Sequence, residues 1–177
     1  AELNPQVFTL YRMATPGVPT LDAYLTRNLR KGQVLGVDPH LVTRARAQRL
    51  EEMLAPREVR VKFLARNLVD AIWADRPEMP STPIFRHPDR YAGETAESKL
   101  ERVREAMKQH GAQAHVITML DAIAWLFNIR GRDVEYNPVT IAYAVVTAKD
   151  ATLFIDETKI PRKLRPWLTG FVRLRPY

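Results

Sequence analysis

The chain has no cysteine among its 177 residues, which excludes disulfides, thiolate metal ligands and a cysteine nucleophile. It has no apolar run approaching the roughly 18 residues that a membrane span needs, and no basic-then-apolar leader begins the chain. It has no phosphate-binding glycine loop and no G-x-S-x-G nucleophile motif. We therefore predict a cytoplasmic globular protein that does not bind a membrane, consistent with 46% hydrophobic and 27% charged residues.

The net charge is +7, and acidic residues are missing only from the last part of the chain. After Glu157 the charged residues are all basic: Lys159, Arg162, Lys163, Arg165, Arg173 and Arg175. Such clusters can bind nucleic acid, but no nucleic-acid-binding motif accompanies this one. We interpret it as a solvated edge or as a surface that meets an acidic partner, and we predict no nucleic acid.

Histidines and carboxylates do not form a recognisable catalytic or metal site. The four histidines are His40, His87, His110 and His115. None has a histidine at i+4 or the set of nearby carboxylates that a metal centre needs. Two pairs of carboxylates, Glu51 with Glu52 and Glu101 with Glu105, are expected on helix surfaces. The sequence therefore predicts neither a catalytic residue nor a metal ligand in this chain.

Alternation of strand and helix patterns predicts an α/β fold. In the first half we expect strands at 7–13, 34–37 and 59–64 and helices at 20–29, 38–55 and 67–73. Asp38 before Pro39 is a typical helix start, and Asn67 is a second expected cap. Trp73 is expected in the core.

Four prolines between residues 76 and 95 block helix formation and indicate a connection between domains. We place the boundary near Pro88, which gives domains 1–87 and 88–177. In the second half we expect helices at 95–110, 118–130 and 161–168, and strands at 114–118, 141–147, 152–155 and 171–174. The strands 141–147 and 152–155 are separated by a short turn and predict a β-hairpin.

The helix expected after residue 118 leads into a dense polar loop. Thr118 and Asp121 have capping-box spacing, and the residues that follow are apolar nearly all round, which predicts a buried helix. Gly131 is expected to end the helix in the left-handed conformation. The loop that follows contains Arg132 to Asn137 and ends at Pro138. A polar loop between a buried helix and a strand often forms a site, although most such loops are simply solvated.

The segment L-D-A-I-A-W-L-F-N-I-R-G-R-D-V-E-Y-N-P, residues 120–138, resembles a signature of the cytosolic-type Xaa-Pro aminopeptidases, in their second domain. N-L-V-D-A-I-W-A-D-R-P-E-M-P, residues 67–80, is similar to the segment that closes the first domain, and V-L-G-V-D-P, residues 34–39, fits upstream. The resemblance implies two creatinase N-terminal-like domains, each a mixed sheet flanked by helices. Compared with the family, the chain is expected to begin midway through the first domain and to stop midway through the second.

The resemblance also implies an activity for a longer parent protein. The family removes an N-terminal residue that precedes proline, using two bridged metal ions, usually manganese. Its ligands are two Asp, one His and two Glu in a C-terminal pita-bread domain, whose motifs this sequence lacks. The chain is therefore expected to be a non-catalytic N-terminal region that shapes the cleft and the assembly. Its expected partners are the rest of the polypeptide, a proline-containing peptide and a second copy of the parent.

By resemblance, the polar loop overlooks the metal cleft and restricts peptide entry. The residues assigned to this cleft wall are Arg130, Arg132, Asp133, Tyr136 and Asn137. Arg130 or Arg132 would pair with a peptide carboxylate, Asp133 would face the free amine, and Asn137 would hold the turn before Pro138. An internal Arg–Asp pair that only stiffens the loop is an equally good interpretation.

A second class of function is also compatible with the resemblance. Some binding proteins keep a peptidase-like fold without activity, as in the large subunit of a histone chaperone, and a basic surface suits an acidic partner. The metal ligands of the parent would distinguish the two interpretations.

Overall fold

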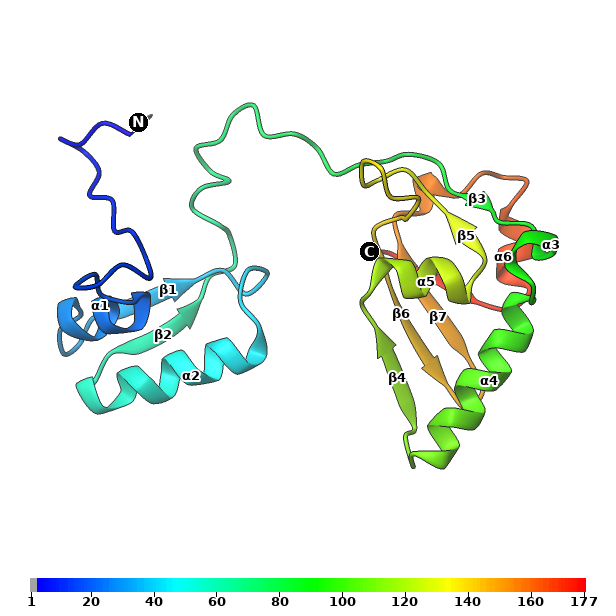
Figure 1. Ribbon diagram of the computed structural model, residues 1–177, viewed down its shortest axis with the longest axis horizontal. Coiled ribbons are helices and arrows are strands. Elements are labelled where there is room, and N and C mark those ends of the chain that lie inside the picture. The colour runs from blue at the N-terminus through cyan, green and yellow to red at the C-terminus, as the bar shows by residue number, and fades with distance from the viewer. Residues whose placement is uncertain (1–2) are drawn as a thin grey trace. The chain divides into compact units, whose positions relative to one another are not determined.

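The computed structural model describes residues 3–177, and the chain forms two compact units, Ala1–Pro77 and Glu78–Tyr177 (Figure 1). Both units combine helices with sheets, which confirms the α/β prediction. Along the chain, the first unit ends at Pro77 and the second begins at Glu78, upstream of the boundary expected near Pro88. The reason is that the end of the proline-rich segment is hydrogen-bonded to the second unit. The Ile84 amide donates to the Lys159 carbonyl at 2.9 Å, and β3 (Phe85–Arg86) pairs with β5 (Ile129–Arg130).

The first unit is built on a parallel pair of short strands, β1 (Val34–Val37) and β2 (Arg60–Phe63). They are joined through α2 (Arg44–Leu54) and the 3-10 turn η1 (Ala55–Arg57), and α1 (Leu21–Asn28) precedes β1. Threonine hydroxyls accept backbone N–H groups at the N-termini of both helices. The buried apolar residues here are Ala47, Leu50, Leu54 and Val59.

Four predictions in the first unit are wrong. No strand forms at residues 7–13 and no helix forms at 67–73, α2 begins at Arg44 rather than after Pro39, and Trp73 is not in the core. The two expected caps bind turns instead: Asp38 Oδ1 accepts the His40 amide at 2.8 Å, and Asn67 Oδ1 accepts the Val69 amide at 2.8 Å. Asn67 Nδ2 also donates to Asp38 Oδ2 at 2.6 Å, which ties the two turns together. Without that helix, Trp73 is exposed.

The second unit contains a four-stranded sheet in the order β4-β6-β7-β8. Its strands are β4 (Ala114–Ile117), β6 (Ala142–Thr147), β7 (Ala151–Ile155) and β8 (Arg173–Arg175). The pairs β4–β6 and β6–β7 are antiparallel, and β7–β8 is parallel. The predicted β-hairpin is therefore confirmed as β6 and β7.

One face of this sheet is covered by α4 (Ala96–Gln109) and α5 (Leu120–Leu126) (Figure 1). The buried pairs Ala142–Ile155, Ala144–Leu153 and Val146–Ala151 each combine a small residue with a larger one. The remaining elements are α3 (Asp89–Ala92), η2 (Glu157–Lys159) and α6 (Arg165–Thr169). None of the helices within residues 3–177 is long and apolar enough to cross a membrane.

Candidate functional site

The polar loop leaves α5 by a different route from the one predicted. The residue before α5 is Met119, whose side chain makes no cap, and Asp121 Oδ1 accepts the neighbouring Ala122 amide rather than a capping-box partner. The left-handed residue after the helix is Asn128, with φ 49°, while Gly131 has no positive φ. The predicted capping box and the predicted role of Gly131 are therefore wrong.

Gly131 is required by close packing instead. A Cβ atom built on it lies 2.8 Å from Thr140 Cβ and 2.9 Å from the Val139 carbonyl oxygen. These atoms belong to the returning leg of the loop, so the two legs approach more closely than any larger residue allows.

Replacing Gly131 by Ala is expected to destabilise the second unit by about 1–3 kcal/mol, because the added methyl overlaps backbone atoms that cannot move independently. Chemical unfolding of the chain, followed by hydrogen exchange of the β6 and β7 amides, measures this loss. Gly170→Ala is the control, since Gly170 has an ordinary helical φ and its nearest neighbour to an added Cβ is 3.1 Å away. Equal losses in the two variants would show that close packing at Gly131 is unimportant.

Asp133 is the centre of the loop's buried polar network. Its Oδ1 accepts the Thr82 hydroxyl at 2.7 Å. Its Oδ2 accepts the Thr140 hydroxyl at 2.9 Å, the Ile141 amide at 2.7 Å and Lys159 Nζ at 2.7 Å. The Asp133 side chain is 0% exposed and that of Lys159 is 3% exposed. One carboxylate thus ties the loop to the proline-rich segment and to η2.

Burial of Asp133 opposes its ionisation, but the hydrogen bonds from Lys159, Ile141, Thr82 and Thr140 outweigh burial and lower its pKa. A carboxylate that is buried, ionised and fully bonded has no free oxygen for a peptide amine. We therefore read Asp133 as a residue that holds the loop.

Arg130 also turns inward. One guanidinium nitrogen donates to the carbonyl oxygens of Ala124 at 2.7 Å and Ile129 at 2.9 Å, so it occupies carbonyl groups around the end of α5. Arg130 and Arg132 are not paired with Asp133, whose ion-pair partner is Lys159. The internal Arg–Asp pair considered from the sequence is therefore not formed.

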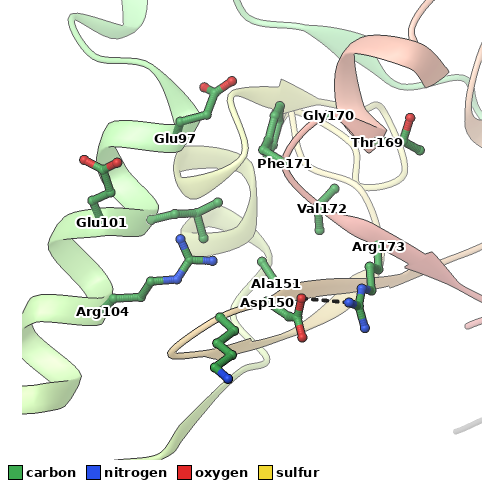
Figure 2. Close-up of a pocket in the computed structure, with 12 residues that line it drawn as sticks. Glu97, Glu101, Arg104, Asp150, Ala151, Thr169, Gly170, Phe171, Val172 and Arg173 are labelled. Carbon is green, nitrogen blue, oxygen red and sulfur yellow. Dashed lines mark ion pairs between the residues drawn. The ribbon is translucent and has the colours of Figure 1, made fainter.

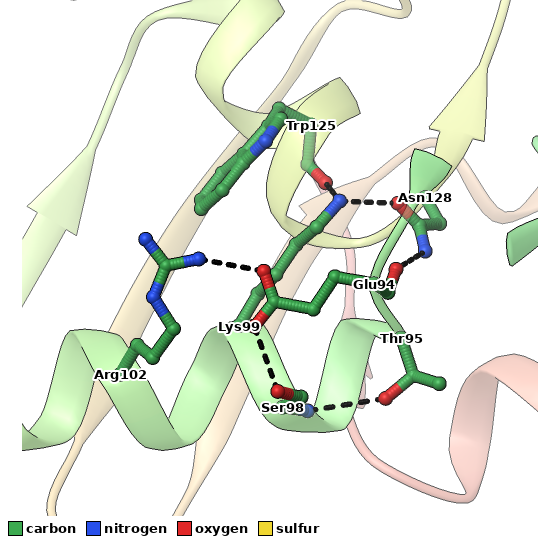
Figure 3. A network of polar contacts seen from close by, with 7 residues as sticks. All are labelled: Glu94, Thr95, Ser98, Lys99, Arg102, Trp125 and Asn128. Atoms are coloured by element: carbon green, nitrogen blue, oxygen red, sulfur yellow. Dashed lines mark hydrogen bonds and ion pairs between the residues drawn. The ribbon is translucent and has the colours of Figure 1, made fainter. Parts of the chain in front are cut away.

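A second buried network holds the start of the loop (Figure 3). Lys99, on α4, is 1% exposed, and its Nζ donates to Asn128 Oδ1 at 2.6 Å and to the Trp125 carbonyl at 2.9 Å. The Trp125 ring lies 4.7 Å from the same ammonium group. Asn128 Nδ2 donates in turn to Asp89 Oδ1 at 3.0 Å and to the Glu94 carbonyl at 2.8 Å. Every polar atom of the Asn128 amide is therefore bonded within the unit.

Sequence reasoning missed Lys99, Asn128 and Lys159. An asparagine just after a helix is a usable signal for a left-handed residue. The two lysines carry no such signal, because lysines on helices and turns are usually solvated.

The tip of the loop remains outside both networks. Its turn is closed by the Asn137 amide donating to the Val134 carbonyl at 3.2 Å. Tyr136 has φ 60° and is 96% exposed, and Arg132 and Asn137 are exposed beside it. A hollow of about 400 Å³ runs along the tip and is lined in part by Arg132 and Tyr136. Of the five residues assigned to the cleft wall, three face solvent and two support the loop from within.

The carboxylates and histidines of the structure are scattered. Within residues 3–177, no three His, Asp or Glu side chains lie close enough together to hold a metal ion. The His, Asp and Glu side chains in this range therefore do not fit a metal centre, and no reaction step is assigned to them.

The chain is similar in sequence to known proteins of one family. Residues 75–177 match the family described as Creatinase/Prolidase N-terminal domain. A probable Xaa-Pro aminopeptidase P from Coprinopsis cinerea is 38% identical over 171 residues, covering 96% of this chain and 28% of that protein. The corresponding protein from Arthroderma gypseum is 41% identical over 171 residues, with 27% of its length covered.

Among solved structures, the chain is similar to the X-prolyl aminopeptidase from Caenorhabditis elegans, described as a cytosolic enzyme with a di-nuclear active site. The TM-score is 0.84 at 34% identity, over 96% of this chain and 28% of that one. The chain thus spans little more than a quarter of the length of the relatives it matches.

Proposed function

Because the chain belongs to the creatinase/prolidase N-terminal domain family, we propose that it is the non-catalytic N-terminal region of an Xaa-Pro aminopeptidase. The parent would remove the first residue of peptides whose second residue is proline. The observation that carries this proposal is similarity along 95–96% of the chain to proteins named Xaa-Pro aminopeptidase P. Both signature segments identified in the sequence lie inside that similarity.

The reaction itself belongs to the rest of the polypeptide. The C. elegans enzyme is described as having a di-nuclear active site, and in the part of this chain that the structure describes the donors do not fit a metal centre. We therefore assign two metal ions, manganese by the family resemblance, to a catalytic domain outside these residues. The same relative is described as cytosolic, and we propose the cytosol for the parent. A homodimer is part of the same proposal.

Within this framework we assign the loop tip to the wall of the substrate cleft. The support comes from the division of the loop between a fixed base and a solvent-facing tip. Asp133 accepts four internal hydrogen bonds and Arg130 donates through one guanidinium nitrogen to two backbone carbonyls, while Arg132 and Tyr136 present a cation and an aromatic ring to solvent. A rigid base of this kind lets a guanidinium meet a peptide carboxylate with little loss of conformational freedom.

The purified chain with added manganese is expected to show no hydrolysis of an Xaa-Pro peptide, because it lacks a fitting set of metal ligands. The full-length parent should cleave the same peptide and lose activity with a chelator. Release of the first residue is measured by chromatography. Chelator-sensitive turnover by the purified chain alone would overturn the assignment of catalysis to another domain.

In the full-length enzyme, Arg132→Ala and Tyr136→Ala are each expected to lower kcat/KM about ten-fold, equivalent to roughly 1.4 kcal/mol, if the tip contacts the peptide in the transition state. Metal content and Tm should not change, because neither side chain supports the fold. Arg162→Ala removes an exposed cation elsewhere in the unit and serves as the control. Unchanged kcat/KM on short and long peptides in both tip variants would remove the tip from the cleft wall.

A further inference from the structure

A second concave site lies away from the loop. It is a pocket of about 440 Å³ between α4, the turn joining β6 to β7, and the segment that enters β8 (Figure 2). Its lining includes the buried side chains of Leu100, Ala151 and Val172. Charged groups of both signs surround this apolar floor.

Carboxylates lie along the α4 wall. Glu97 and Glu101 are one helical turn apart and both line the pocket, so their like charges repel each other. Within residues 3–177, neither has a basic side chain within 4.0 Å. A cation bound between them would relieve this repulsion.

Cations gather at the other end of the pocket. Arg104 Nε donates to the Thr147 carbonyl at 3.1 Å, which fixes the guanidinium group and leaves its two terminal nitrogens for a ligand. Lys149 lies on the turn and has no carboxylate within 4.0 Å in the described part of the chain. Arg173 is paired with Asp150 at 2.9 Å, so this pair adds no net charge.

The spacing of the two ends limits what the pocket can hold. Along the axis of α4, the backbone of Arg104 lies about 5 Å beyond that of Glu101 and about 10 Å beyond that of Glu97, from a rise of about 1.5 Å per residue. An anion alone would contact only the basic end of the pocket, and a cation alone only the acidic end. A ligand that uses both ends carries one charge of each sign, a few ångströms apart.

We propose that this pocket binds a short zwitterionic peptide, with its ammonium group against Glu97 and Glu101 and its carboxylate against Arg104 and Lys149. The volume lies within the range of small-molecule sites, and the apolar floor accepts the body of the peptide. The proposal does not depend on the peptidase assignment, because it concerns binding by this chain alone.

Titration of the chain with glycylglycine, followed by amide chemical shifts, tests the proposal. Saturable shifts are expected at residues 149–151 and 169–173, which line the pocket. N-acetyl-glycylglycine lacks the ammonium and glycylglycinamide lacks the carboxylate, and each should bind at least about ten-fold more weakly. Equal binding of either blocked peptide, or shifts that do not saturate at these residues, would overturn the proposal.

Variants of the charged residues test the proposed peptide site independently. Glu101→Gln should weaken glycylglycine about ten-fold while leaving N-acetyl-glycylglycine unchanged, and Arg104→Gln should weaken glycylglycine while leaving glycylglycinamide unchanged. Glu105→Gln is the matched control, because Glu105 is on the same helix but outside the pocket. If Glu105→Gln weakens binding as much as Glu101→Gln, only the general charge of the helix matters and the proposed site is wrong.

Discussion

Replacing Asp133 by Asn is expected to lower the free energy of unfolding of the second unit by about 3–5 kcal/mol. The substitution leaves the ammonium group of Lys159 buried without a counter-charge, and breaking a buried pair from one side has a cost of this size. It also replaces an acceptor of four hydrogen bonds by an amide that cannot accept them all. Hydrogen exchange of the β6 and β7 amides reports the loss, because these are the central strands of the sheet.

Two controls separate the buried charge from general effects. Glu157→Gln breaks the exposed pair with Arg165, and its expected cost is at most about 1 kcal/mol. Adding Lys159→Met to Asp133→Asn removes the uncompensated charge and should restore part of the stability. If Asp133→Asn costs no more than Glu157→Gln, the buried pair does not hold the loop.

The same carboxylate predicts a dependence on pH. Its folded-state pKa is lowered, so its contribution to stability is fully present above the unfolded pKa of about 3.9. That contribution is lost as pH falls through the folded pKa. The stability difference between wild type and Asp133→Asn should therefore be constant from pH 7 to about 5 and shrink below about pH 4. A constant difference down to pH 2 would contradict this assignment.

Replacing Asn128 by Ala is expected to cost about 3 kcal/mol. The variant removes an acceptor from the buried Lys99 ammonium, and hydrogen bonds to charged groups contribute about 1.5–3 kcal/mol. It also places Ala at φ 49°, a left-handed conformation that asparagine adopts more readily than alanine. The loss of stability is measured by hydrogen exchange of the β6 and β7 amides, as for the Asp133 variant.

Asn128→Gly separates the two contributions, because glycine accepts the left-handed backbone but makes no side-chain bonds. It should be more stable than Asn128→Ala by about 1 kcal/mol. Lys99→Met should cost less in the Asn128→Gly background than in the wild type, since the two side chains are in direct contact. Additive losses from Lys99 and Asn128 would show that the network in Figure 3 does not act as a unit.

Sequence patterns correctly located the helices and strands for which the hydrophobic periodicity and the residues at the ends of the element indicate the same structure. A helix was expected at residues 95–110, and α4 occupies that range with the Thr95 hydroxyl as its cap. The hairpin of β6 and β7 followed equally from two β-rich runs and a short turn. Local periodicity is sufficient there because the tertiary contacts favour the same conformation.

Capping residues were the least reliable signals. Asp38 and Asn67 are good helix caps by type, yet each accepts a turn amide two residues on, and they bind each other. The same short polar side chains stabilise turns and helix starts about equally well. Contacts between residues 29 positions apart decided which structure formed.

By itself, the sequence determined the α/β class, the order of the four-stranded sheet's strands and of the helices α4, α5 and α6 along the chain, and the resemblance that singled out the loop at Arg130–Pro138. Tertiary structure alone decided the roles within that loop. Lys159, 26 positions from Asp133, supplies the counter-charge, and Lys99, 29 positions from Asn128, supplies the donor. The reason is that a charge needs a partner only where the fold excludes water, and a linear sequence does not specify which side chains meet there.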